Sequence, residues 1–109
     1  MENSYIMIFV TTKDKEEAEK ITEALLNKHL IACGNIVFPV TSLFYWLGNV
    51  DRVEECLVVM KSRLDLFGQV AESVRDLHSY EVPEVLAVPI IGGSKDYFDW
   101  MDLVLKQAK

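Results

Sequence analysis

The sequence contains little cysteine, proline or glycine: two, three and five residues, respectively, among 109. Cys33 and Cys56 do not form a Cys-x-x-Cys pair, so the sequence supports neither a dithiol redox site nor a zinc knuckle. Both lie in apolar runs, and we expect reduced thiols rather than a disulfide. Half of the residues are hydrophobic, so the sequence predicts one packed domain over residues 1–109 rather than disorder.

Positive charge is also scarce. Lys and Arg number 11 against 17 Asp and Glu, which gives a net charge of −6. Nucleic acids and anionic membranes attract proteins through positive charge, so neither is an expected partner. The longest apolar runs, "LFYWL" and "CLVVM", are far shorter than the ~20 residues of a membrane-spanning helix. The start of the chain is acidic where a signal peptide is positively charged, and we expect a cytoplasmic protein.

Strand-like and helix-like segments alternate along the chain. Segment 5–12 is short, β-branched and aromatic, as buried strands are. Segment 63–78 places apolar residues on one helical stripe. The predicted strands are 5–12, 31–46, 53–62 and 84–91, and the predicted helices are 14–29, 63–78 and a third that begins after Ser94.

This order predicts an α+β fold, a ferredoxin-like βαββαβ sandwich with an extended β-hairpin and an added C-terminal helix. The first two helices are expected on one face of an antiparallel sheet. Thr12 or Asp14 is the expected N-cap of the first helix, and Ser94 that of the last. Pro39 predicts an edge, a bulge or a bend in its strand, and Pro89 an edge or a strand end.

The predicted hairpin is longer than the helix layer that would cover it. Segment 31–46 would extend about 50 Å as a strand, whereas helix 14–29 would be about 24 Å long. The overhanging run is apolar at consecutive positions, so large side chains face both sides of the sheet. We therefore expect an obligate homo-oligomer whose contacts through the 31–62 hairpin include Leu43, Phe44, Tyr45, Trp46 and Leu47. The alternative is a flexible aromatic flap on a monomer.

Several motifs resemble one known family. They are "LIACGNI" (30–36), Ser42 with Trp46 and Gly48, "EECLVVMKS" (54–62), "HSYEVPE" (78–84) and "YFDW" (97–100). In this order and spacing the chain resembles the CutA family of divalent-cation tolerance proteins over residues 5 to 105. The resemblance implies a ferredoxin-like fold, a tight homotrimer similar to the PII signalling proteins, and a role linked to copper and other divalent cations. It implies no catalytic activity and no organic cofactor.

The chain departs from the family pattern at four positions. Ser79 stands where proline is usual, and Phe44 where tyrosine is usual. Asn49 replaces a common lysine, and Gly34 is small where larger residues are frequent. Phe44 removes a hydroxyl from the expected cleft between subunits, which weakens any claim that a tyrosine is essential there.

The segment "HSYEVPE" joins the second helix to the fourth strand. His78 can either complete this corner by hydrogen bonding at the end of the helix or bind a metal. Pro83 favours an extended backbone before the strand. Glu81 and Glu84 can serve the corner or supply hard oxygen ligands.

Cys33 and His78 are the best candidate metal ligands, for copper or another divalent cation. Two ligands are too few for a closed structural site, so a subunit boundary would have to add more. The alternative places Cys33 in the core as a small hydrophobic residue, which is also the expectation for Cys56.

The candidate ligand-binding residues are Glu55, Lys61, Tyr80, Glu81, Glu84 and Trp46. Glu55 and Lys61 share strand parity, and they are either rim charges or the lining of a polar cleft between subunits. Trp46 and Trp100 are expected mainly as packing anchors.

Four functions compete. The first is a non-catalytic trimer that binds a metal ion or small ligand between subunits, with a PII-like signalling role. The second is a small cytosolic enzyme that uses Cys33 or Tyr80 with His78, although no third catalytic residue is recognisable. A ferredoxin-like copper carrier would need cysteines in the loop "TTKDK", which has none. An RNA-binding sheet would need aromatic and basic residues that the central strands lack.

Overall fold

A computed structural model describes residues 4–107, and these residues form the predicted α+β sandwich. Its elements are β1 (Tyr5–Thr12), α1 (Lys15–Asn27), β2 (Cys33–Trp46), β3 (Asn49–Arg63), a 3₁₀ turn (Leu64–Leu66), α2 (Phe67–Leu77), β4 (Val85–Pro89) and α3 (Lys95–Val104). The strands form one antiparallel sheet in the order β2-β3-β1-β4. No helix within residues 4–107 is long and apolar enough to cross a membrane.

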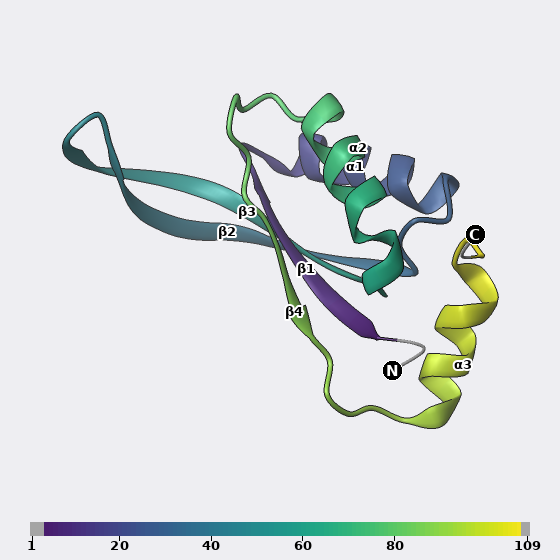
Figure 1. Cartoon of the computed structure of the whole chain (residues 1–109). Coiled ribbons are helices and arrows are strands. Elements are labelled where there is room, and N and C mark those ends of the chain that lie inside the picture. Colours follow the sequence, from purple (N-terminus) through teal and green to yellow (C-terminus); the bar gives the residue numbers. More distant parts are fainter. Residues whose placement is uncertain (1–3, 108–109) are drawn as a thin grey trace.

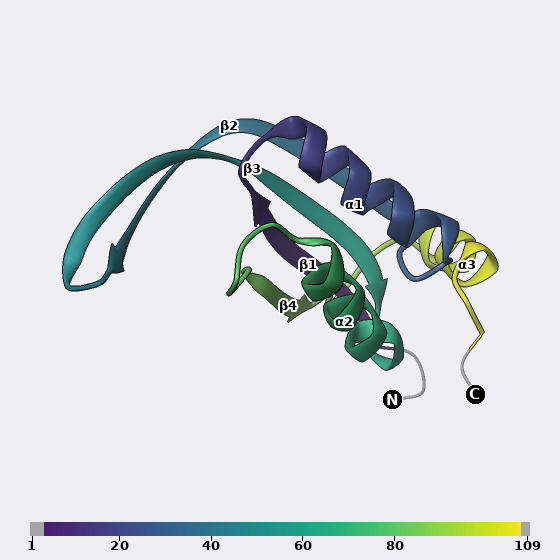
Figure 2. The same cartoon turned by 90° about the horizontal axis from the view of Figure 1, so that it is seen from above.

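Helices α1 and α2 cover the same face of the sheet, as predicted, and α3 lies beyond one end of it (Figures 1 and 2). β1 buries every second residue, so Ile6, Ile8 and Val10 point toward the helices. They pack in one apolar cluster with residues such as Ile21 of α1 and Val74 of α2. The side chains on the inward face of the strands and those on the apolar stripes of the helices thus pack together in a single core.

The helix ends have the expected caps. The side chain of Asp14 accepts the backbone N–H of Glu17 at 2.8 Å, and Ser94 accepts that of Tyr97 at 3.3 Å. After α1 the chain turns at His29, whose φ is +60°, and the N–H of Leu30 bonds back across the helix end. The caps predicted at Asp14 and Ser94 are confirmed.

The β2–β3 hairpin extends beyond the rest of the sheet, as predicted. β1 ends where Thr12 pairs with Cys56, so residues 49–55 of β3 pair with β2 alone. Figure 1 shows this two-stranded arm reaching away from the helices. We call residues 40–55 the hairpin arm. A bulge between Val37 and Val40 lies at its base, where Pro39 predicted an irregularity.

The tip of the arm carries large apolar side chains on both faces. Tyr45 is 77% exposed and its neighbour Trp46, which points to the opposite face, is 53% exposed. Leu43 and Leu47 are exposed as well. The single chain therefore leaves these large side chains uncovered.

Several predicted boundaries were wrong. β2 begins at residue 33 rather than 31, and β3 begins at residue 49 rather than 53. The predicted loop 47–52 is a two-residue turn, because Leu47 and Gly48 both adopt positive φ and the strands pair up to Trp46 and Asn49. α2 begins at Phe67, after the 3₁₀ turn, rather than at residue 63.

The sheet face opposite α1 and α2 is also apolar. In the register, Phe9 pairs with Leu86 on one side and with Val59 on the other, and Met7 pairs with Val88. Residues that pair directly point to the same face. Leu86 is 61% exposed, so this face, like the hairpin arm, is incompletely covered within one chain.

Candidate functional site

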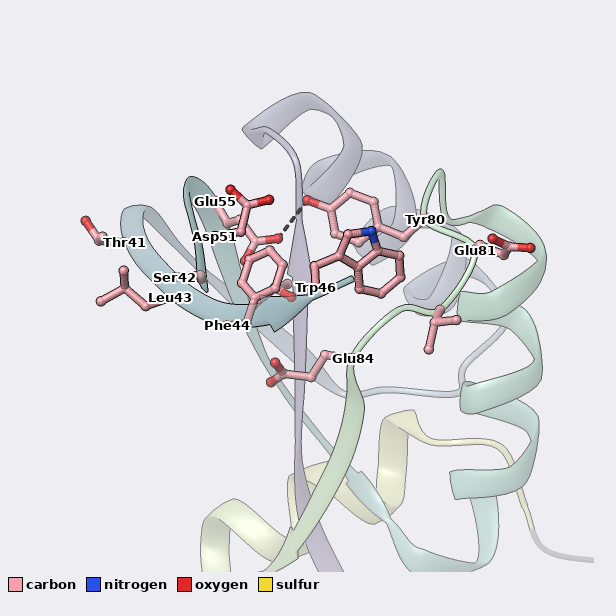
Figure 3. Close-up of a pocket in the computed structure, with 12 residues that line it drawn as sticks. Thr41, Ser42, Leu43, Phe44, Trp46, Asp51, Glu55, Tyr80, Glu81 and Glu84 are labelled. Carbon is pink, nitrogen blue, oxygen red and sulfur yellow. Dashed lines mark hydrogen bonds between the residues drawn. The ribbon is translucent and has the colours of Figure 1, made fainter. Parts of the chain in front are cut away.

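A cleft of about 690 Å³ lies where the hairpin arm meets the corner between α2 and β4. It is lined by Thr11, Thr41, Ser42, Leu43, Phe44, Trp46, Asp51, Glu55, Tyr80, Glu81, Val82 and Glu84. Figure 3 shows the phenol of Tyr80 pointing toward Glu55, while Thr41 and Glu81 lie at opposite margins. Five of the six predicted ligand-binding residues therefore line one cleft.

Glu55 and Tyr80 form the centre of this cleft. The phenol of Tyr80 donates a 2.7 Å hydrogen bond to Oε2 of Glu55, which is only 6% exposed. Burial, followed by this bond and the charge of Glu55, raises the pKa of Tyr80 well above its ordinary value. Tyr80 therefore stays a neutral donor at physiological pH, and it is unsuited to act as a phenolate nucleophile.

The cleft is strongly acidic. Its lining includes Asp51, Glu55, Glu81 and Glu84 and no basic residue. Partial desolvation, and then the charge of Glu55, raise the pKa of Glu84 above its ordinary value. The site thus concentrates negative charge beside the aromatic rings of Phe44 and Trp46.

Lys61, the sixth predicted ligand-binding residue, lies elsewhere. Its Nζ donates to Oδ1 of Asn35 and lies 4.0 Å from Sγ of Cys33. Six positions of β3 separate it from Glu55, about 20 Å along an extended strand. Within one chain, Glu55 and Lys61 do not line the same cleft, although their shared parity suggested it.

His78 completes the corner beside the cleft. Its side chain is fully buried, its Nε2 lies 2.7 Å from the carbonyl oxygen of Thr11, and its Nδ1 lies 3.0 Å from the backbone N of Tyr80. A carbonyl only accepts and an N–H only donates, so the ring is the neutral tautomer with its proton on Nε2. Both ring nitrogens are occupied, which favours the structural role that the sequence left open.

Glu17 is a residue of this region that the sequence interpretation missed. Its Oε2 accepts the backbone N–H of Ser79 at 2.7 Å, and its Oε1 accepts that of Lys13 at 3.3 Å. Partial burial raises the pKa of Glu17, but the hydrogen bonds from Ser79 and Lys13 outweigh it, and the pKa is lowered. The spacing Asp14-x-x-Glu17 resembles a capping box and was the available signal.

Cys33 and His78 do not meet within one chain. Cys33 pairs with Lys61, whereas the carbonyl that His78 contacts belongs to Thr11, which pairs with Leu57. Those two β3 positions are about 13 Å apart along the strand. The described residues therefore do not bring the proposed metal pair together. Tyr80 does lie beside His78, with ring centroids 4.7 Å apart, but its hydroxyl donates to Glu55 and both ring nitrogens of His78 contact backbone groups.

The described part of the chain holds no obvious metal cage. Among residues 4–107, no group of three or more His, Cys, Asp or Glu residues is arranged to hold a metal ion. Cys33 is partly exposed and Cys56 is buried, and both are free thiols. Cys56 is in the core, as expected. Trp100 lies against Tyr97 in α3 and is 39% exposed, so it is only a partial packing anchor.

Comparison with known proteins identifies the family. The CutA1 divalent ion tolerance protein family matches residues 6–103, which is most of the chain. The chain belongs to this family. The divalent-cation tolerance protein CutA of Archaeoglobus fulgidus is 41% identical over 95 residues, covering 87% of this chain and 92% of the relative. Protein CutA of Homo sapiens is 34% identical over 100 residues, covering 92% of this chain and 56% of the relative.

Solved structures of family members have the same fold. CutA1 from Oryza sativa superposes with a TM-score of 0.94 at 33% identity, covering 96% of each chain. The CutA from A. fulgidus, described as a periplasmic divalent cation tolerance protein, superposes with a TM-score of 0.91 at 38% identity, covering 94% of this chain and 99% of that one. The predicted family and the predicted fold are both confirmed.

Proposed function

We propose that this protein is a homotrimer that contributes to divalent-cation tolerance by binding a ligand at the cleft beside the hairpin arm, without catalysing a reaction. The observation that carries the proposal is the arm itself, which extends past β1 with exposed aromatic and aliphatic residues on both faces. Burying such side chains contributes about 1.5–3 kcal/mol each. Further copies of the chain offer complementary apolar surface, including the open sheet face around Phe9 and Leu86.

The trimeric state follows the family resemblance, whereas the physical argument requires only self-association. In a trimer the arm of one subunit would lie against another, and the cleft would sit at that boundary. The PII-like signalling role rests on the same resemblance. A cytoplasmic location stays a prediction, and related proteins include one named chloroplastic, from Arabidopsis thaliana.

A binding role agrees with the chemistry of the cleft. Tyr80 is held as a neutral hydrogen-bond donor to Glu55, and His78 uses both ring nitrogens for backbone contacts. Cys33 lies away from His78 along the sheet. The enzyme alternative, which requires Cys33 or Tyr80 beside an available histidine, therefore has no geometric support within the chain.

The proposal can be tested in cells that lack their own CutA relative and are challenged with copper. The wild-type chain should restore growth, and Glu55→Gln, which removes the cleft's buried charge, should restore it less. Glu23→Gln, an equal change at an exposed position of α1, should match the wild type. Equal growth with and without the wild-type chain would contradict the tolerance role. Full rescue by Glu55→Gln would contradict the assignment of the cleft.

A further inference from the structure

Glu55 is a buried carboxylate without a positive partner. It is 6% exposed, and the only hydrogen bond to its side chain within residues 4–107 is the one that Tyr80 donates to Oε2. The ion pairs of the described residues do not include it. Oε1 of Glu55 accepts no hydrogen bond, and it is not among the fully buried side-chain atoms of residues 4–107 that lack a partner, so it is accessible from the cleft that Glu55 lines. An accessible carboxylate oxygen beside a mostly buried one marks a position for a cation.

The surroundings of Glu55 indicate what kind of cation fits. Asp51 and Glu84 also line the cleft, and they come from the arm and from the start of β4. Asp51 and Glu55 are four positions apart on β3, about 13 Å along the strand, and Figure 3 shows Glu84 on the other side of the Phe44 ring from both. Negative charges are thus separated by apolar surface.

A bare divalent ion does not match this arrangement. Calcium takes six to eight oxygens at about 2.3–2.6 Å, and magnesium requires near-octahedral geometry. No group of three or more acidic, His or Cys side chains within residues 4–107 is placed to do this. The cleft, at about 690 Å³, has the size of a site for an organic molecule.

We propose that this cleft binds a linear polyamine. One ammonium group binds Oε1 of Glu55, further ammonium groups bind Asp51 and Glu84, and the methylene segments lie against Phe44 and Trp46. Charge-assisted hydrogen bonds to carboxylates and cation–π contacts with a tryptophan face suit this chemistry. The inference rests on the proposed function, because it names the ligand class of the same cleft.

Calorimetry with spermidine, putrescine and magnesium chloride tests this assignment. Putrescine and Mg²⁺ carry the same charge, so their comparison separates recognition of a shape from attraction by net charge. With the assembled wild-type protein at about 0.15 M salt, where exposed charges more than about 8 Å apart are screened, spermidine should bind once per cleft and more tightly than putrescine. Magnesium should give no saturable heat.

Substitutions at the cleft should weaken spermidine binding selectively. Loss of one charge-assisted contact lowers affinity by about tenfold, which is the effect expected for Glu55→Gln. Glu84→Gln, at an exposed position that does not endanger folding, should weaken binding severalfold. Glu23→Gln removes the same charge from the exposed side of α1 and should leave the affinity unchanged.

Three results would overturn the polyamine assignment. The first is that the wild type does not bind spermidine. The second is that Glu23→Gln weakens spermidine binding as much as the cleft variants do. The third is that magnesium binds as tightly as putrescine. If copper or zinc then binds an assembled wild type and loses affinity in Glu55→Gln, the proposed function stands without the polyamine. If the protein is a single subunit that binds none of these ligands, both proposals fail.

Discussion

The backbone N–H of Ser79 donates a 2.7 Å hydrogen bond to Oε2 of Glu17, which ties the corner after α2 to the first turn of α1. A proline at position 79, which the family resemblance leads us to expect, would have no N–H to donate. Serine at this position therefore allows a hydrogen bond to Glu17 that proline could not make. The same corner carries His78 and Tyr80 to the edge of the cleft.

Glu17→Gln should destabilise the protein by about 1–2 kcal/mol at pH 7, because a neutral amide accepts the Ser79 and Lys13 N–H groups less strongly than a carboxylate. The pKa of Glu17 is lowered in the folded protein. Its stabilisation is therefore present above the ordinary glutamate pKa of about 4.3, and it is lost as pH falls through the lower folded value. Urea unfolding at fixed protein concentration, repeated from pH 7 to pH 3, measures this.

The control for Glu17 is its neighbour Glu16, which is exposed in the same helical turn. Glu16→Gln should change the unfolding free energy by less than about 0.5 kcal/mol. A Glu17→Gln penalty that stays constant down to pH 3 would show that the carboxylate charge is not responsible.

His78→Leu should destabilise the protein by about 2–4 kcal/mol, because it leaves the Thr11 carbonyl and the Tyr80 N–H without their buried partner. His78→Gln should lose less, since an amide side chain can both donate and accept. Thermal or urea unfolding gives the stability, and calorimetric titration with copper gives the affinity. A structural histidine predicts lost stability with unchanged copper affinity. Unchanged stability with weakened copper binding would identify His78 as a ligand instead.

Gly34→Ala should destabilise the protein by about 1–3 kcal/mol. A Cβ at position 34 would lie 2.5 Å from Cγ2 of Thr22, so β2 and α1 would have to separate. Thr22→Ala removes that methyl group, and in this background Gly34→Ala should cost less than about 0.5 kcal/mol. Unfolding of the wild type, both single variants and the double variant provides the cycle. If the stability changes of the two single variants simply add in the double variant, the close contact with Thr22 does not explain why glycine occupies position 34.

Local signals were sufficient for most of the fold. The alternation in β1, the stripe in α2 and the caps at Asp14 and Ser94 were readable because each depends on residues close in sequence. The turn at Leu47 and Gly48 could not be predicted from the sequence, because leucine with positive φ is unusual and "NVDR" resembles a loop sequence more than a strand.

The site was only partly predictable because strand parity says which face a residue occupies but not how far along the sheet it meets another segment. Glu55 and Lys61 share a face, but Glu55 lies in the middle of β3 and Lys61 six positions further on, near its end. Cys33 and His78 were paired as metal ligands because of their side-chain chemistry alone. The strand register of the sheet places them apart. The contact between Tyr80 and Glu55 depends on how the corner folds over the base of the hairpin arm.

Sedimentation velocity at low micromolar concentration tests most directly whether other copies of the same chain cover the hairpin arm. Tyr45 and Leu47 are 77% and 86% exposed in a single chain, so replacing both by glutamate should not harm the folding of a lone subunit. Lys20→Glu changes the net charge by the same amount at an exposed position of α1. We expect a species of three 12.5 kDa chains for the wild type and Lys20→Glu, and a smaller species for Tyr45→Glu/Leu47→Glu. A wild type that sediments as one folded chain, or a double variant that assembles as the wild type does, would contradict this expectation.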